Sequence, residues 1–444
     1  MRRAIVCMFV LGLGSEIAPA QSVEEGRRGD LAIFRREFFA RDSSYSAENR
    51  AEAERRLRAL ESKPASLTAA QFELELARIV ALADNGHTNS PASMRSRRYA
   101  RVPIRLVPFG EQFYVLRADT PNADLLGALL VAIDGKPLRD VRTSAHALWG
   151  GTPAWRDRQL PFLLESPDQM HAAGITTGSG AVSYRFKLRN GRTVDRRIVA
   201  EAPNAAREIY SPTRWLYPEP LDTDRGDWRF VGTREGAPWA FQDPTQLFRL
   251  RAAPELDAIV IQLRANHNGQ QSIQEFLTRA ADEIRRSGPR NLVLDLRVNG
   301  GGDLNNTRDF VQSLPALVPG RIFILTSPWT FSAAISTTGY LKQAGGNRVT
   351  IVGEMVGDRL EFWAEGRLVR LNYSSAAMSY STQRHDYKTG CRPYADCHGA
   401  VVRNPISVPS LAPDIAAPLT VDAIIAGRDP GMEAIATALG RSRN

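Results

Sequence analysis

The sequence contains few residues of the types that most often act as bases or nucleophiles. Among its 444 residues are six histidines and three cysteines, and only five of its 57 basic residues are lysines. Arginine therefore supplies almost all of the positive charge. A mechanism that needs a lysine, a histidine or a thiol must draw on a very short list of candidates. The lysines are Lys63, Lys136, Lys187, Lys342 and Lys388.

Long hydrophobic runs and blocks of like charge are also missing. No run approaches the ~18–20 apolar residues of a membrane-spanning helix, so we expect no membrane span. The net charge of +9 is spread along the chain without a polybasic block, which gives no support to a nucleic-acid partner. The composition, 43% hydrophobic and 24% charged, is typical of a globular protein. At ~150 residues per domain, the length predicts two or three packed units.

The N-terminus has the layout of a secretory signal peptide. Met1-Arg2-Arg3 is a basic start, residues 4–14 are apolar, and Ala18-Pro19-Ala20 is an A-x-A cleavage pattern before Gln21. A buried N-terminal helix is the alternative, but so short an apolar stretch at the terminus disfavours it. We therefore assign residues 1–20 to a signal peptide and expect export to the periplasm or the extracellular space.

Cleavage would remove Cys7 and leave Cys391 and Cys397 as the only cysteine pair. In an oxidising compartment two cysteines this close most simply form a disulfide. The alternative is a zinc site with His385 and His398, because cysteine and histidine both bind zinc. The spacing matches no standard zinc pattern, so we expect the disulfide, no metal, no cofactor and no nucleophilic cysteine.

Four segments follow the signal peptide. Residues 21–98 read as helices, with capping patterns at Ser46 and at Thr68 with Gln71. The last of these helices is expected to end near residues 84–86, with Gly86 in a left-handed conformation and His87 on the following loop. Residues 99–200 contain short β-like runs. Residues 201–255, rich in proline and tryptophan, have little periodicity and read as a linker or extension.

Residues 256–444 have an α/β pattern. Apolar runs predict strands at 258–263, 291–296, 321–326 and 348–352. Ser272 and Glu275 form a capping pattern for a helix between the first two strands, and a further helix is expected at 332–344. A strand, helix and strand in succession imply a parallel pair with a right-handed crossover.

Two loops follow predicted strands of this segment, at the sheet edge where α/β proteins place their ligand sites. Residues 295–303 read Asp-Leu-Arg-Val-Asn-Gly-Gly-Gly-Asp. The glycines allow close backbone approach to a ligand, although a tight turn is the simpler interpretation; Asn305 replaces the third glycine of a dinucleotide fingerprint. In the second loop, Ser332 begins a helix, either as an N-cap or as a nucleophile whose oxyanion faces the helix start.

Together these stretches resemble the tail-specific, or C-terminal-processing, serine peptidases, which include the tricorn core protease. The likeness rests on Asp-Leu-Arg-x-Asn-Gly-Gly-Gly at 295–302, Thr-Phe-Ser-Ala-Ala at 330–334 and Val-Gly-Glu at 352–354, together with Asp-Asn-Gly-His-Thr at 84–88 and Ala-Pro-Asp-Ile at 412–415. The resemblance implies an α/β fold: a crotonase/ClpP-like spiral catalytic domain at 256–444, an N-terminal helical region, and a small PDZ-like β-rich domain at 99–200.

The resemblance also implies roles for individual residues. Ser332 would be the nucleophile, and the amides of Gly301 and Ala333 would form the oxyanion hole. One branch of the family uses a lysine about 25 residues after the serine, but Gly357, Asp358 and Arg359 occupy that region, and arginine stays protonated. The other branch uses Ser-His-Glu, and its histidine matches His87. Histidine suits proton transfer at neutral pH.

The third catalytic residue is less well matched. The family's glutamate lies in a Glu-Asn-x-Gly-Val-like stretch, to which Asp396 and the residues after it are the nearest likeness. Asp396 is therefore the expected orienting acid, with Glu361 and Glu365 as alternatives.

These observations favour an exported serine peptidase that hydrolyses peptide or protein substrates through an acyl-enzyme. The alternative is a catalytically degenerate ligand- or peptide-binding protein on the same scaffold, as in interphotoreceptor retinoid-binding modules. A third hypothesis is crotonase-type acyl chemistry, which the expected export and the lack of a recognisable coenzyme-A feature disfavour.

Overall fold

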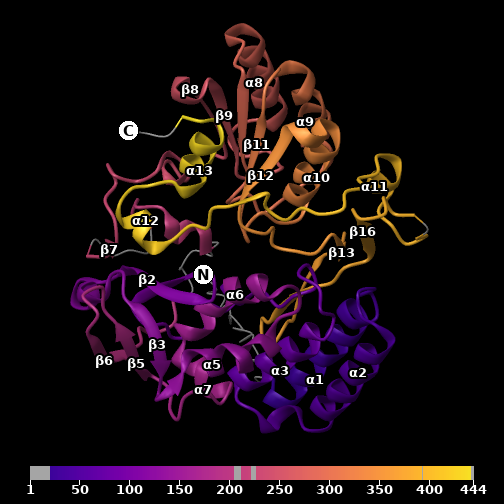
Figure 1. The fold of residues 1–444 in the computed structure, drawn as a ribbon. Coiled ribbons are helices and arrows are strands. Elements are labelled where there is room, and N and C mark those ends of the chain that lie inside the picture. Colours follow the sequence, from indigo (N-terminus) through magenta and orange to yellow (C-terminus); the bar gives the residue numbers. More distant parts are fainter. Residues whose placement is uncertain (1–20, 205–211, 222–226, 393, 442–444) are drawn as a thin grey trace, which may run out of the picture.

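The protein is described from a computed structural model covering residues 21–204, 212–221, 227–392 and 394–441. The expected signal peptide, residues 1–20, lies outside these described residues. Within them, no helix combines the length and the apolar character needed to cross a bilayer. The architecture is a mixture of helices and sheets, so the α/β class expected from the sequence is confirmed (Figure 1).

A six-stranded sheet forms the centre of the C-terminal half, in the order β17-β12-β11-β10-β9-β8. Its strands are β8 (Phe248–Ala253), β9 (Ala258–Leu263), β10 (Asn291–Asp295), β11 (Ile322–Thr326), β12 (Val349–Gly353) and β17 (Ile415–Ala416). All neighbours are parallel except β8, which pairs antiparallel with β9. The four strands expected from buried apolar runs are confirmed.

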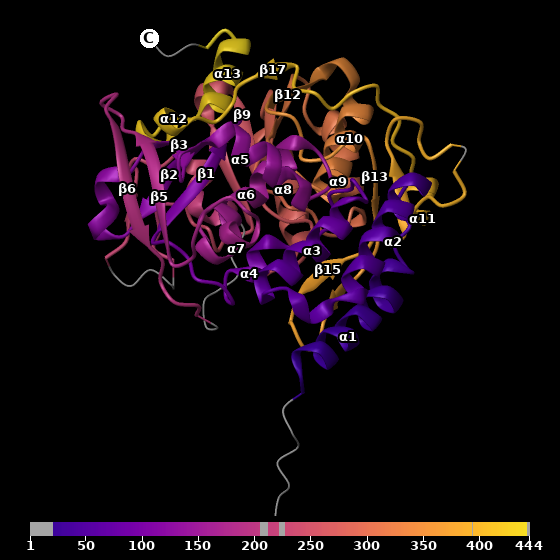
Figure 2. The same cartoon turned by 90° about the horizontal axis from the view of Figure 1, so that it is seen from below.

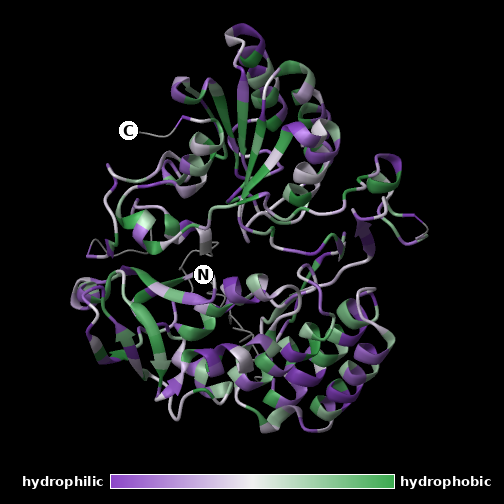
Figure 3. Ribbon diagram, in the orientation of Figure 1, coloured by the Kyte–Doolittle hydropathy of each residue, from purple (hydrophilic) through white to green (hydrophobic). Residues whose placement is uncertain are grey.

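Helices cover both faces of this sheet. α8 (Ile273–Ser287), α9 (Asn305–Leu317) and α10 (Ala333–Gly345) connect successive parallel strands and pack on one face, while α13 (Pro430–Ala438) lies on the other (Figure 1). Ser272 caps α8 through a hydrogen bond from the Glu275 N–H, as its sequence predicts. Side chains alternate between the two faces, and the hydrophobic colouring of the central strands follows from this double burial (Figure 3).

The N-terminal half has two parts. Helices α1 (Val23–Ile33), α2 (Ala47–Ser62), α3 (Ala69–Ala81) and α4 (Ala92–Arg95), with a π-helical turn at Phe34–Phe39, form the helical region. Thr68 and Gln71 make the expected reciprocal cap at the start of α3. The helices share their core with β14 (Leu368–Arg370) and β15 (Ala377–Ser379), an antiparallel pair from the C-terminal half (Figure 2).

The second part is an antiparallel sheet in the order β1-β2-β3-β5-β6, with two short strands added to it. Its strands are β1 (Ile104–Phe109), β2 (Gln112–Ala118), β3 (Leu129–Ile133), β4 (Lys136–Pro137), β5 (Ala181–Lys187), β6 (Thr193–Val199) and β7 (Arg229–Phe230). Helices α5 (Leu138–Ala145), α6 (Pro153–Leu164) and α7 (Pro167–Ala172) lie between β4 and β5 along the chain. The β-rich character expected of this segment is present.

The structure differs from the sequence-based expectation at two places. Asp84, not Gly86, takes the left-handed conformation after α3, with φ of 47°; aspartate tolerates this region better than most residues. Strand β8 lies within the segment that was expected to be irregular. Its arginines at 249 and 251 obscured the strand pattern, although five of its six residues are buried or half-buried.

A short ribbon connects the two halves. β13 (Glu361–Ala364) pairs antiparallel with β16 (Gln383–Asp386), which places Phe362 opposite His385. The chain then passes through α11 (Gly399–Arg403) and α12 (Val421–Ile425). Asn85 exchanges two hydrogen bonds with the backbone of Trp363, at 3.0 and 3.1 Å, so the ribbon holds the loop that carries His87.

Candidate active site

Ser332 lies between β11 and α10, at the N-cap of the helix. Its backbone has φ of 55° and ψ of −127°, outside the regions that non-glycine residues favour. Such a conformation costs about 1–3 kcal/mol and persists only where the surroundings impose it. The side chain makes no capping hydrogen bond, so the N-cap interpretation does not account for this serine.

The glycine loop packs directly against Ser332. A Cβ added to Gly301 would lie 2.6 Å from the Ser332 Cβ, closer than real Cβ contacts allow. Asn299 organises this contact: its backbone carbonyl accepts from the Phe331 N–H at 3.0 Å, and its Oδ1 accepts from the Gly301 N–H at 2.9 Å. In the described residues, no group accepts a hydrogen bond from the N–H of Gly302 or of Ala333.

A cavity of about 340 Å³ opens at Ser332. The glycine loop and the first turn of α10 form one wall, and side chains of β13, β16 and the loop before α11 form the other. Its lining residues are Gly302, Asp303, Leu304, Asn305, Ser332, Ala333, Ser336, Phe362, Glu365, His385 and His398. The first residues of α10 present the positive end of the helix dipole to this space. The arrangement could therefore stabilise an oxyanion formed on a substrate beside Ser332.

His87 lies next to the residue that precedes the serine. Its ring stacks on Phe331, with centroids 4.4 Å apart, and on Phe362 at 5.0 Å. Its Nδ1 is 3.7 Å from Oδ2 of Asp358, a carboxylate that is 1% exposed. Gly86 permits this approach, because a Cβ there would lie 2.9 Å from the Asp358 Oδ2.

Three polar atoms in this arrangement have no hydrogen-bond partner among the described residues. They are both ring nitrogens of His87 and Oδ2 of Asp358, and all three are buried. The Ser332 Oγ is likewise not hydrogen-bonded to any histidine within the described chain. An unsatisfied buried polar group costs about 1–3 kcal/mol, and such groups in a native structure commonly mark a reactive or ligand-binding site.

Comparison with known structures adds a fold assignment. The structure of mature CPAF complexed with lactacystin aligns over 94% of this chain and 97% of its own, with a TM-score of 0.56 and 13% sequence identity. A second structure of mature CPAF aligns over 94% and 96%, with a TM-score of 0.55 and 13% identity. The chain has the fold of the tail-specific serine peptidases. The resemblance predicted from the motifs is thereby confirmed.

Three further comparisons complete these findings. The photosystem II D1 C-terminal processing protease aligns over 95% of this chain and 98% of its own at 13% identity, with a TM-score of 0.38. No protein-family model matches the sequence, and no curated protein matches it.

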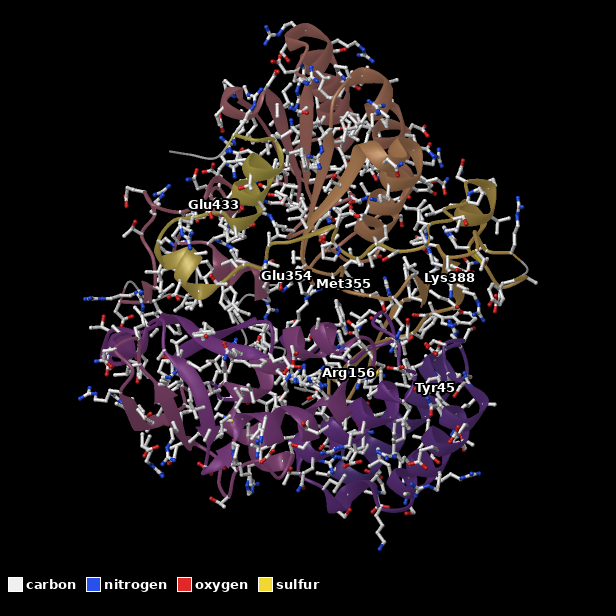
Figure 4. The ribbon with its side chains drawn as sticks, in the orientation of Figure 1. Tyr45, Arg156, Glu354, Met355, Lys388 and Glu433 are labelled. Carbon is white, nitrogen blue, oxygen red and sulfur yellow. A yellow bond between two sulfur atoms is a disulfide. The ribbon has the colours of Figure 1, made fainter. Side chains whose placement is uncertain are left out.

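Among the described residues, no lysine lines the cavity at Ser332. Lys342 lies near the far end of α10, where its Nζ donates to the Val349 carbonyl at 2.8 Å and pairs with Asp414 at 2.9 Å. Arg359, near the position of the lysine in the Ser-Lys branch, pairs with Asp84 at 2.8 Å. The residues at the end of β12, among them Glu354 and Met355, lie at the edge of the sheet that faces the N-terminal half (Figure 4).

The expected orienting acid has a different partner. Asp396 forms an ion pair with Arg384 at 3.1 Å, and Arg384 also pairs with Glu361. In the described structure Asp396 makes no ion pair with His87; the carboxylate beside the His87 Nδ1 is that of Asp358, 3.7 Å away. The disulfide between Cys391 and Cys397 is formed, with Cα atoms 6.0 Å apart.

The remaining expected alternative, Glu365, contacts two other histidines. Its Oε1 lies 3.1 Å from Nε2 of His385 and 3.8 Å from Nδ1 of His398. The hydrogen bond with His385 lowers the pKa of Glu365, and burial lowers the pKa of His385. At neutral pH the cluster therefore contains an ionised carboxylate beside a neutral buried imidazole.

Sequence reasoning overlooked Asp358 and Phe362 as site residues. Asp358 did carry a signal, because it lies where the Ser-Lys branch has its lysine. Phe362 carried none, since only the pairing of β13 with β16 brings its ring between His87 and His385.

Proposed function

We propose that the protein is a serine peptidase that cleaves peptide or protein substrates through an acyl-enzyme on Ser332. The observation that carries this proposal is the backbone of Ser332, which has a positive φ at the start of α10. The side chain of Ser332 makes no capping hydrogen bond, and the residue lines a cavity. A strained backbone conformation at such a position is typical of an active-site nucleophile, because the surrounding structure fixes the direction of its hydroxyl.

The oxyanion of the tetrahedral intermediate would be bound by two backbone amides. Ala333 supplies the first, at the positive end of α10. The sequence suggested Gly301 as the second donor, but its N–H already donates to Asn299. We therefore assign this role to Gly302, whose N–H has no acceptor in the described chain and which lines the cavity.

His87 is the proposed general base and Asp358 the residue that orients it. As the Ser332 Oγ attacks the substrate carbonyl carbon, its proton passes to Nε2 of His87, and Asp358 stabilises the imidazolium through Nδ1. The same proton then passes to the leaving amine, and water repeats the sequence to release the acyl group. The His87 imidazole must approach Ser332 in the substrate complex, since catalytic hydrogen bonds often form only there.

Hydrolysis of a mixed peptide library tests the proposal. Purified protein should cleave peptides, and Ser332→Ala should reduce kcat by at least ~10³-fold with its folding unchanged. Because a structure of mature CPAF is complexed with lactacystin, that compound is a suitable probe, and it should protect Ser332 from modification. Cleavage that persists undiminished in Ser332→Ala would overturn the assignment.

A catalytically degenerate binding protein is the second candidate. The observation in its favour is that the described structure has no hydrogen bond from Ser332 to a histidine, while aromatic rings enclose His87. Such a protein would retain peptides from the same library without cleaving them, and Ser332→Ala would leave their affinity unchanged.

We further propose an exported protein with a peptide-binding module. The disulfide suits an oxidising compartment, and the basic, apolar and A-x-A pattern of residues 1–20 suits secretion. The antiparallel sheet within residues 99–200 is proposed as PDZ-like, and residues 256–444 as a crotonase/ClpP-like spiral. Residues 201–255 would connect these two units.

A further inference from the structure

Two histidines and a glutamate meet on the wall of the Ser332 cavity. One potential ligand atom from each of Glu365, His385 and His398 lies within 4.8 Å of the others. The glutamate oxygen is 3.1 Å from one imidazole nitrogen and 3.8 Å from the other. His398 Nδ1 is buried and has no hydrogen-bond partner in the described structure.

Packing and hydrogen bonds hold His385 in place. It is 4% exposed, stacks on Phe362 with centroids 5.0 Å apart, and stacks on His398 at 5.2 Å. Its Nδ1 is 2.9 Å from the hydroxyl of Tyr387, which in turn is 2.5 Å from the Ser336 Oγ. A metal-binding histidine commonly donates its second ring N–H to such a partner, which fixes the other nitrogen as the ligand.

Backbone pairing positions His398. Its N–H donates to the Arg384 carbonyl at 2.9 Å, and the Arg384 N–H donates to the Asp396 carbonyl at 3.0 Å. The disulfide between Cys391 and Cys397 closes the loop directly before His398. The cysteines are thus unavailable as metal ligands, and the potential ligand beside the two histidines is the carboxylate of Glu365.

We propose that Glu365, His385 and His398 bind a divalent transition-metal ion of the Zn²⁺ class beside Ser332. Two imidazoles and one carboxylate suit Zn²⁺, Co²⁺ or Ni²⁺, whereas Mg²⁺ and Ca²⁺ prefer oxygen ligands. Three protein ligands leave further coordination positions, which face the cavity. The ligand atoms of a tetrahedral zinc site lie about 3.3 Å apart, given bonds of about 2.0–2.1 Å. Here the carboxylate oxygen lies 3.1 and 3.8 Å from the two imidazole nitrogens, and all three atoms lie within 4.8 Å of one another, so side-chain adjustment would complete the site.

Occupancy would affect the chemistry of Ser332. An ion with its bound water would occupy part of the cavity that Ser332 also lines, and would compete there with a substrate. Metal binding should therefore inhibit hydrolysis reversibly, and a chelator should restore it. This consequence rests on the proposed function, whereas metal binding itself does not.

Titration of the metal-free full-length mature protein with Co²⁺ tests the site without an activity assay. We expect one equivalent to bind and to produce the strong visible absorption of four- or five-coordinate cobalt, which Zn²⁺ abolishes and Mg²⁺ does not. His398→Ala and Glu365→Gln should each weaken binding by at least ~10–100-fold, and Tyr387→Phe by a similar factor through the lost second hydrogen bond. His267→Ala, at an exposed histidine outside the cluster, should bind as the unmodified protein does.

Folding of each variant is checked by circular dichroism. Absence of stoichiometric Co²⁺ binding by the folded protein, or equal binding by folded His398→Ala and Glu365→Gln, would overturn the proposal. Stoichiometric binding without inhibition of hydrolysis would retain the metal site and contradict only its inhibitory effect. Failure of Ser332 to act in catalysis would leave the spectroscopic result unaffected, so the two failures are distinguishable.

Discussion

The imidazole of His87 lies flat against the ring of Phe362, with centroids 5.0 Å apart and 8° between the ring planes. The same phenyl ring stacks on His385 at 5.0 Å, with 9° between the planes. The Phe362 ring therefore lies between the two imidazoles and keeps them apart. His87 lies beside Asp358, and His385 lies beside Glu365. This separation divides the site into a proposed base and a proposed metal cluster.

Replacing His87 tests the proposed base. His87→Ala should lower kcat by about 10²–10⁴-fold, the usual contribution of general acid–base catalysis, with a much smaller effect on KM. Steady-state kinetics on a peptide substrate provide the measurement. His267→Ala, at an exposed position, serves as the matched control and should retain full activity. A His87→Ala enzyme as fast as the control would remove His87 from the mechanism.

Asp358→Asn tests the orienting carboxylate. The amide cannot stabilise an imidazolium as a carboxylate does, so kcat should fall by about 10²-fold or more while the fold is retained. Asp309→Asn on α9, whose side chain is 81% exposed, is the control. If Asp396→Asn reduced kcat while Asp358→Asn did not, the assignment expected from the sequence would replace this one.

Two adjacent glycines allow a sharp comparison. Gly301→Ala places a methyl group 2.6 Å from the Ser332 Cβ at a position with φ of 103°, so it should displace the serine and abolish hydrolysis. Gly300→Ala meets no atom within 4 Å and should leave hydrolysis nearly unchanged. Equal activity of the two variants would show that the close approach of this loop to Ser332 does not matter.

Acid should weaken the largely buried ion pair between Arg297 and Asp429. Burial alone would raise the pKa of Asp429, but the guanidinium of Arg297, 2.7 Å away, holds that pKa below its ordinary value. A lowered pKa in the folded state stabilises the fold above the unfolded-state pKa of about 3.9, and this stabilisation is lost as the pH falls further. Because Arg297 keeps Asp295 as a partner, Asp429→Asn should reduce the unfolding free energy by about 1–2 kcal/mol at pH 7 and by less near pH 3.

Urea denaturation of the two proteins at each pH measures this difference. The asparagine keeps the capability to cap α13, so the comparison isolates the charge. A destabilisation of equal size at both pH values would show that the carboxylate charge contributes nothing.

The disulfide should contribute measurably to stability. It closes a loop of six residues' separation, for which the loss of chain entropy in the unfolded state is worth about 2 kcal/mol. Replacing both Cys391 and Cys397 by serine should lower the unfolding free energy by that amount and also weaken Co²⁺ binding, since His398 follows the bridge directly. Unchanged stability and unchanged metal affinity would contradict both expectations.

Much of the fold was predictable because its signals are local. Buried runs such as 258–263 and 291–296 are apolar at nearly every position, and Ser272 and Thr68 begin helices through hydrogen bonds to residues three positions on. The edge strand β8 was not predictable, because Arg249 and Arg251 interrupt the apolar pattern and only pairing with β9 defines the strand.

The site was predictable only where a motif carried it. Ser332 and His87 belong to recognisable stretches, and the absence of a lysine near Ser332 in the sequence favours a histidine base. Asp358 and Phe362 depend on contacts between segments roughly 280 residues apart, such as that of Asn85 with Trp363, which no local pattern reveals. Glu365 contacts His385, 20 residues later, and this contact depends on the pairing of β13 with β16. The hydrogen bond from the Gly301 N–H to the Asn299 Oδ1 likewise determines that Gly302, not Gly301, is the proposed oxyanion donor. No sequence pattern predicts this hydrogen bond.

Labelling with a serine-reactive phosphonate, followed by peptide mass mapping, tests the central claim most directly. If Ser332 is an activated nucleophile, the unmodified protein should carry one phosphonate adduct, located on Ser332, and Ser332→Ala should carry none. No adduct on the folded, metal-free protein, or an adduct formed equally by Ser332→Ala, would contradict the claim that Ser332 is the nucleophile.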